Sequence, residues 1–162
     1  MKRLTMLAVV VVAVALAAGA AQGVTVKSKE GVGNYLADSK GMTLYYFKSD
    51  SPGKSACTGG CLNWWPIFHS EDLQVPEGLD AGDFGAITRG DGKKQTTFRG
   101  YPLYYFGGDS KPGDMKGQGS RGVWFVVDPG KFMMEGEMMR EGEGMMEEGG
   151  GMMERQKKGY GY

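Results

Sequence analysis

Residues 44–50, Leu-Tyr-Tyr-Phe-Lys-Ser-Asp, return 59 positions later as Leu-Tyr-Tyr-Phe-Gly-Gly-Asp at residues 103–109. The offset holds without a gap from position 41 to position 65, with nine identities, four of them aromatic. Outside the quoted stretches, the identical residues at equivalent positions are Gly41 and Gly100, Ser51 and Ser110, Gly60 and Gly119, and Trp65 and Trp124. A repeat of this kind predicts two similar halves, which determine the architecture.

The two copies of the repeat have the side-chain pattern of β-strands. Successive side chains of a strand point to opposite faces, so Leu44 and Tyr46 share one face while Tyr45 and Phe47 share the other. Bulky residues on both faces indicate a strand that is buried on each side. The 29 glycines argue against long helices. We therefore expect an all-β, or mainly β, domain of two similar repeats related by an approximate twofold, with short strands and Gly/Pro-rich turns.

Turn residues divide the rest of this region into further short strands. Residues 90–92, Gly-Asp-Gly, are typical of a hairpin turn. Residues 51–53, Ser-Pro-Gly, favour a type II turn, because proline fixes φ and glycine tolerates a positive φ. The additional strands are expected at residues 24–26, 35–38, 87–89, 95–98 and 123–127.

The N-terminus has the three parts of a secretory signal. Lys2 and Arg3 are followed by an uncharged apolar run at residues 7–16 and by the small-x-small pattern at residues 18–20. The run is shorter than the roughly 20 apolar residues of a bilayer span. We expect residues 1–20 to be removed on export, leaving a periplasmic or extracellular protein without a stable membrane span. Retention of the segment as an anchor stays open as an alternative.

The charge balance of the exported chain bears on its partners. Removal of Lys2 and Arg3 leaves 17 Lys+Arg against 19 Asp+Glu, a net charge of −2. Nucleic-acid-binding proteins are expected to present a basic face, so we expect no nucleic-acid partner.

The sequence also predicts the domain boundaries. A core can form over residues 24–130, with the repeats at about 33–68 and 92–129, and a tail follows at residues 131–162.

The tail is rich in Met, Glu and Gly. Its glycines disfavour a helix, so we expect a flexible segment. Thioether sulfur is a soft ligand that selects Cu(I), which makes an exported copper site one interpretation. The alternatives are an adaptable surface for an envelope-protein partner, a sacrificial target of oxidants, and low-complexity drift. The paired methionines are Met133, Met134, Met138, Met139, Met145, Met146, Met152 and Met153.

Cys57 and Cys61 are the only cysteines. In an oxidising compartment, two cysteines this close in the chain normally form a disulfide. Haem attachment requires Cys-x-x-Cys followed by His, and Leu62 follows Cys61. A structural disulfide is the first interpretation, and a metal or redox role is the alternative. The second half has Lys116 and Ser120 at the equivalent positions, so it folds without such a bond.

His69 is the only histidine and follows Cys61 by eight residues. Together with Cys57 and Cys61, it provides sulfur and imidazole ligands of the kind that bind copper. The alternative is a solvated histidine in a polar connection.

Asp50 and Asp109 occupy equivalent places in the two copies. A twofold can bring them together as a carboxylate pair suited to acid/base chemistry. The simpler interpretation is that each ends its strand and accepts backbone N–H bonds in the following turn. The repeated aromatic residues are likewise interpreted as core before they are interpreted as a ligand platform. Residues 89–91, Arg-Gly-Asp, are explained by the hairpin turn alone.

The repeated residues carry a family resemblance. Their pattern, Tyr-x-(Phe/Trp/Tyr)-x-x-Asp, resembles the motif of bacterial secreted-repeat proteins, which are often lipoproteins, and the similarity extends from about residue 33 to residue 129. The family has no settled biochemical function, so the resemblance implies a location and not an activity. The matching residues are Tyr45, Phe47 and Asp50 in the first copy and Tyr104, Phe106 and Asp109 in the second.

The sequence contains no Ser/His/Asp, multi-histidine or phosphate-loop constellation. We therefore expect an exported cell-envelope protein that is not an enzyme and acts as a binding or structural module. The alternative is a periplasmic or extracellular Cu(I) binder or carrier that uses the Met-rich tail. No other cofactor is expected.

Overall fold

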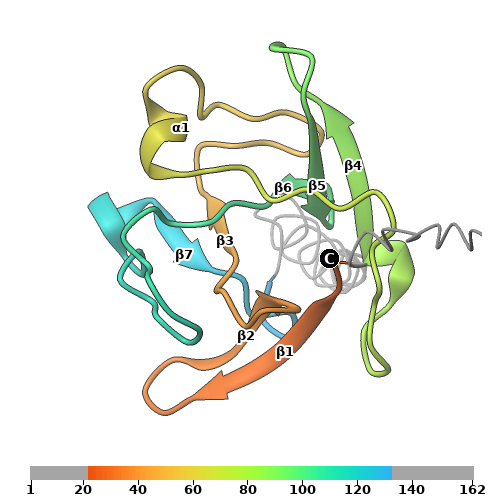
Figure 1. Ribbon diagram of the computed structural model, residues 1–162, viewed down its shortest axis with the longest axis vertical. Coiled ribbons are helices and arrows are strands. Elements are labelled where there is room, and N and C mark those ends of the chain that lie inside the picture. Colours follow the sequence, from red (N-terminus) through yellow and green to blue (C-terminus); the bar gives the residue numbers. More distant parts are fainter. Residues whose placement is uncertain (1–21, 133–162) are drawn as a thin grey trace, which may run out of the picture.

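The computed structural model describes residues 22–132, and this part of the chain consists mainly of short strands with little helix (Figure 1). Its elements are β1 (Val24–Lys29), β2 (Gly33–Asp38), β3 (Tyr45–Phe47), α1 (Cys61–Trp64), η1 (Ala81–Asp83), β4 (Phe84–Thr88), β5 (Lys94–Phe98), β6 (Tyr101–Pro102), η2 (Ser120–Gly122) and β7 (Trp124–Val126). The strands form a sheet of β1 and β2, a sheet of β3 and β7, and a sheet in the order β4-β5-β6. The predicted fold class is confirmed.

Each half begins with an antiparallel hairpin. β1 pairs with β2 along its whole length, and β4 pairs with β5 in the same way. Figure 1 shows β1 and β2 at the bottom of the molecule and β4 and β5 at its upper right. Residues 90–92 form the turn of the second hairpin, as the sequence predicted.

The two halves meet at the repeated strand. One edge of β3 pairs with β7. On its other edge Tyr45 exchanges both backbone N–H···O bonds with Tyr104, each at 2.9 Å. Because these residues are equivalent in the repeat, the exchange places an approximate twofold axis between them. Further bonds follow the same relation: Lys48 N–H to the Val123 carbonyl (2.8 Å) and Gly107 N–H to the Trp64 carbonyl (2.7 Å). The predicted twofold is therefore formed within one chain.

Gly41 and Gly100 are equivalent positions at which the fold requires glycine. Both have φ of +83°, a conformation that costs other residues energy. An added Cβ would lie 3.0 Å from the side chain of Pro112 at Gly41, and 3.2 Å from that of Pro52 at Gly100. The carbonyl of each glycine also accepts an N–H from the residue after that proline. Each half therefore packs its Pro-Gly turn on the glycine of the other half.

The core has two clusters, which lie on opposite faces of the repeated strands. Leu44 and Tyr46 pack in the first cluster, whereas Tyr45 and Phe47 pack in the second. The second copy divides in the same way, with residues 103 and 105 in the first cluster and residues 104 and 106 in the second. This is the alternation that the sequence predicted for a strand buried on both sides.

The folded domain extends two residues beyond Gly130, where the sequence placed its end. Phe132 is 8% exposed and packs edge-on against Tyr46, with ring centroids 4.8 Å apart. Its carbonyl accepts a hydrogen bond from Arg99 Nη1 at 2.7 Å.

The predicted signal peptide and all eight paired methionines of the tail lie outside the described residues. Among residues 22–132, no helix is long and apolar enough to cross a membrane.

Candidate ligand-binding groove

The motif tyrosines and aspartates of the two halves bind each other across the axis. Tyr45 donates its hydroxyl to Asp109 Oδ2 at 2.6 Å, and Tyr104 donates its hydroxyl to Asp50 Oδ2 at 2.7 Å. Both tyrosines are fully buried. Burial is the main cause that raises the pKa of each, and the neighbouring carboxylate adds to it. The hydroxyls therefore keep their protons and act as hydrogen-bond donors, not as bases.

Each motif carboxylate also has a backbone partner in its own turn. Asp50 Oδ1 accepts the N–H of Ala56 at 2.6 Å, and Asp109 Oδ1 accepts the N–H of Lys116 at 2.9 Å. These contacts agree with the simpler interpretation, in which each aspartate ends its strand. Each carboxylate thus binds a tyrosine hydroxyl and a backbone amide, rather than the other carboxylate as in an acid/base pair.

A buried arginine of the second half, Arg89, lies next to Asp50 of the first half. Arg89 is 7% exposed and donates from Nη1 to Ser55 Oγ (2.8 Å) and to Gln95 Oε1. The hydroxyls of Ser55 and Tyr104 are 2.6 Å apart, which connects the guanidinium to the Tyr104–Asp50 bond. Burial raises the pKa of Asp50, and the Ala56 amide, the Tyr104 hydroxyl and Arg89 act in the opposite direction.

The disulfide between Cys57 and Cys61 is confirmed, with their Cα atoms 5.5 Å apart. Cys57 is buried, and its carbonyl accepts a bond from Arg89 Nη2 at 2.5 Å. Cys61 begins α1. The disulfide therefore fixes the loop that leads into α1, which ends at the exposed Trp64. Its two sulfurs are not available as thiolate ligands.

Replacing both cysteines with serine is expected to lower the free energy of unfolding by about 2 kcal/mol, because so short a loop loses little entropy when it closes. The β-rich circular dichroism spectrum should be unchanged. Guanidinium unfolding of the mature protein and the double variant measures the difference. Equal midpoints, or two titratable thiols in the native protein, would contradict a stabilising disulfide.

Four aromatic rings stack across the axis. Trp65 and Trp124, equivalent residues, lie parallel with ring centroids 3.8 Å apart. Phe47 stacks on Trp124 at 4.3 Å, and its equivalent Phe106 packs on Trp65 at 4.6 Å. The stack thus places one ring of each half against a ring of the other.

An open groove of about 630 Å³ runs along this stack. It is lined by all four stacked rings and by Trp64, so it contains every tryptophan of the protein. Trp64 is 64% exposed, the most exposed large apolar side chain among residues 22–132. Large concave apolar surfaces with a few polar groups are the usual form of ligand sites. The groove is therefore the candidate site.

Two departures from the repeat give the groove different ends. The equivalent of Trp64 is Val123, which also lines the groove, so only one side carries the exposed ring. Arg121 replaces Leu62 of the first half. It is exposed, makes no ion pair within residues 22–132, and has φ of +53°. Backbone strain of this kind is found at ligand sites more often than elsewhere.

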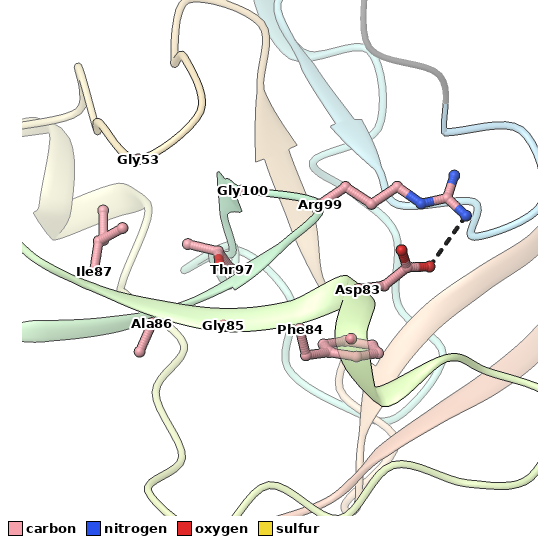
Figure 2. A pocket seen from close by; sticks show the side chains of 10 residues that line it. Gly53, Asp83, Phe84, Gly85, Ala86, Ile87, Thr97, Arg99 and Gly100 are labelled. Atoms are coloured by element: carbon pink, nitrogen blue, oxygen red, sulfur yellow. Dashed lines mark ion pairs between the residues drawn. The ribbon is translucent and has the colours of Figure 1, made fainter.

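A second hollow is lined by β4 together with Gly53, Thr97 and Gly100, and its two charged side chains bind each other. Figure 2 shows Arg99 at one end, reaching away from Ile87 and Thr97 to its ion pair with Asp83, at 3.1 Å. The second terminal nitrogen of Arg99, Nη1, donates to the carbonyl of Phe132. This arginine ties two parts of the fold together and is not free to bind a ligand.

His69 lies in a separate shallow hollow with Met42, Asp38 and Asp109. Its Nδ1 is buried and has no hydrogen-bond partner in the described part of the chain. Asp38 is bound by Tyr105 at 2.9 Å and by two backbone amides. Among the described residues, no group of three or more His, Cys, Asp or Glu is arranged to hold a metal ion. The copper ligand set of His69 with two thiolates is excluded by the disulfide.

The sequence profile of one family, described as a secreted repeat of unknown function, matches residues 24–69 and 85–128. The chain belongs to this family. The two matches coincide with the two halves that meet at Tyr45 and Tyr104. Membership places this secreted repeat protein among exported proteins. Comparison with curated proteins and with solved structures gave no match.

Three residues of this secreted repeat protein were not recognised as functional or structural candidates from the sequence. Arg89 was interpreted as a turn residue, and Trp64 is not among the residues that the two copies share. Arg121 stands among glycines and gave no signal by itself. Comparison of the two halves at the 59-residue offset was the available signal, because it shows where Trp64 and Arg121 depart from Val123 and Leu62.

Proposed function

We propose that this secreted repeat protein is a non-enzymatic binding module of the cell envelope, in the periplasm or outside the cell. Its ligand has an apolar body and a negative charge, and it lies in the aromatic groove. The observation that carries this proposal is the exposed Trp64 beside a four-ring stack, with Arg121, which has no ion-pair partner among residues 22–132, in the same groove.

The chemistry of the groove supports such a ligand. Aromatic rings offer large, rigid contact areas at a small entropic cost, so they dominate many binding surfaces. A guanidinium binds carboxylates and phosphates through a rigid fork of donors. Arg121 provides such a group next to the rings, and none of the described acidic residues lines the groove. The combination favours an anionic ligand over a cationic one.

The polar groups of the core support a role other than catalysis. A nucleophile needs a base within hydrogen-bond reach that can take its proton. The Ser55 hydroxyl is bound to Tyr104 and Arg89, neither of which is a proton acceptor at neutral pH. Asp50 and Asp109 are bound by tyrosine hydroxyls and amides. These groups hold the two halves together.

The apolar anion 8-anilinonaphthalene-1-sulfonate (ANS) is expected to bind the native mature protein with a 1:1 stoichiometry. Trp64→Ala should weaken its binding by about tenfold, because the exposed ring is lost. The control is Val26→Ala, which removes the other large apolar side chain that is exposed among residues 22–132, 41% exposed on β1. The measurement is a fluorescence titration, with near-ultraviolet circular dichroism to verify folding.

Equal ANS affinity in the mature protein and Trp64→Ala would refute the groove as the binding site. Robust hydrolase or thiol-oxidoreductase turnover that is lost on changing Asp50, Asp109 or Cys57 would refute the non-enzymatic role.

A second candidate function, a Cu(I) binder or carrier, is supported by the eight paired methionines. His69 is the one imidazole that the folded domain can add, with the thioether of Met42 in the same hollow. In a Cu(I) competition titration, replacing the eight tail methionines with serine should abolish tight binding. His69→Ala should weaken it only if the domain contributes a ligand. Unchanged affinity in the serine variant would refute the tail as a copper site.

A further inference from the structure

We propose that the occupant of the aromatic groove is the Met- and Glu-rich tail of the same chain, residues 133–162. This inference rests on the proposed function, because it names the ligand of the same groove. The tail then covers Trp64 within its own molecule and competes with any external ligand.

The methionine side chains of the tail suit the aromatic rings of the groove. Apart from the two tyrosines near its end, the large apolar residues of residues 133–162 are all methionines. Thioether sulfur makes favourable contacts with aromatic rings, and its unbranched side chain adapts to irregular surfaces. The groove offers the exposed ring of Trp64 and the partly buried rings of Phe47 and Phe106 to such side chains, above the buried Trp65–Trp124 pair.

Charge supports the same pairing. Glutamate directly follows three of the four methionine pairs, at residues 135, 147 and 154. Residues 133–162 contain seven Glu against four Arg+Lys, a net charge of −3. The described residues 22–132 contain 13 Lys+Arg against 12 Asp+Glu, a net charge of +1. A methionine pair on the rings therefore brings a carboxylate to the side of Arg121, whose guanidinium has no ion-pair partner among the described residues.

The tail is long enough to reach the groove. The fold holds the chain up to Phe132, which packs in the first cluster, whereas the groove borders the second cluster. A domain of this size is about 35 Å across. Half the circumference of such a domain is about 55 Å, and the 20 residues from Phe132 to Met152 span up to about 66 Å when extended, so the fourth methionine pair can reach any face. A covalent tether also raises the effective concentration of the tail to the millimolar range, so weak contacts suffice.

The experiment compares the mature full-length protein with a tail variant in which the eight paired methionines are replaced by serine. ANS is the probe of the groove. We expect the tail variant to bind ANS at least about threefold more tightly than the unaltered chain, because the competing tail contacts are lost. The difference should not depend on protein concentration, and Trp64→Ala should abolish it.

Indole N–H resonances give a second readout, since all three tryptophans line the groove. The Trp64 resonance should move between the unaltered chain and the tail variant, while the amides of the β1–β2 hairpin stay in place. Arg121→Met should reduce the ANS difference, because it removes the partner of the glutamates.

Equal ANS affinity in the two proteins, with an unmoved Trp64 resonance, would overturn the inference. A difference that grows with protein concentration would also overturn it, since the tail would then come from a second copy. If ANS affinity does not depend on Trp64 in either protein, the proposed function itself fails, which separates the two failures.

Discussion

Arg89→Met is expected to lower the free energy of unfolding by about 3–5 kcal/mol, the usual cost of removing one partner from a buried charged network. The guanidinium binds the Cys57 carbonyl, Ser55 Oγ and Gln95 Oε1, and each acceptor loses a donor in the variant. The Asp50 carboxylate also loses a nearby positive charge that lowers its pKa. Methionine retains much of the side-chain volume, so the effect reports on polar contacts and charge rather than on a cavity.

Guanidinium unfolding of the mature protein, Arg89→Met and Arg121→Met measures this effect. Arg121 is the matched control because it is an exposed arginine that makes no ion pair within residues 22–132. Its replacement should change the free energy of unfolding by less than about 0.5 kcal/mol. A loss below about 1 kcal/mol in Arg89→Met would show that solvent already satisfies these groups.

The sequence predicted the repeat, the mainly β fold, the approximate twofold and the disulfide, because each depends on local residue types and their spacing. The alternation of Leu44, Tyr45 and Tyr46 predicted which face each side chain takes, and the two core clusters confirm it. The Pro-Gly turns and the hairpin at residues 90–92 were also recognisable, since turn residues act through their own φ angles.

The contacts between the halves were not predictable in the same way. Nothing within one copy indicates that Tyr45 binds Asp109 of the other half instead of its own Asp50. Arg89 resembles a surface turn residue, because its buried partners lie elsewhere in the chain, at positions 55 and 57 in particular. Long-range partners of this kind follow from the docking of the two halves, and a single sequence shows the halves but not how they dock.

Alkaline pH is expected to unfold the protein steeply above about pH 10, the ordinary pKa of tyrosine. Burial raises the pKa of Tyr45 and of Tyr104, so the folded protein keeps both protons while the unfolded chain loses them. The stability is therefore complete below about pH 10 and is lost as the pH rises toward the folded-state pKa values. Each retained proton costs up to about 1.4 kcal/mol per pH unit once the pH is well above 10, or up to about 2.7 kcal/mol per unit for the pair.

The slope of the unfolding free energy against pH separates tyrosine ionisation from the loss of the two hydrogen bonds. Tyr45→Phe/Tyr104→Phe removes both hydroxyls, so the double variant should be less stable at neutral pH because Asp50 and Asp109 each lose a donor. Its free energy of unfolding should nevertheless fall less between pH 10 and pH 11, by roughly 2 kcal/mol in total for the two tyrosines. Guanidinium unfolding at several pH values gives the slopes, and tyrosinate absorbance near 295 nm reports ionisation. Ionisation of all eight tyrosines in the still-folded protein would contradict the prediction, since Tyr45 and Tyr104 would then titrate without unfolding.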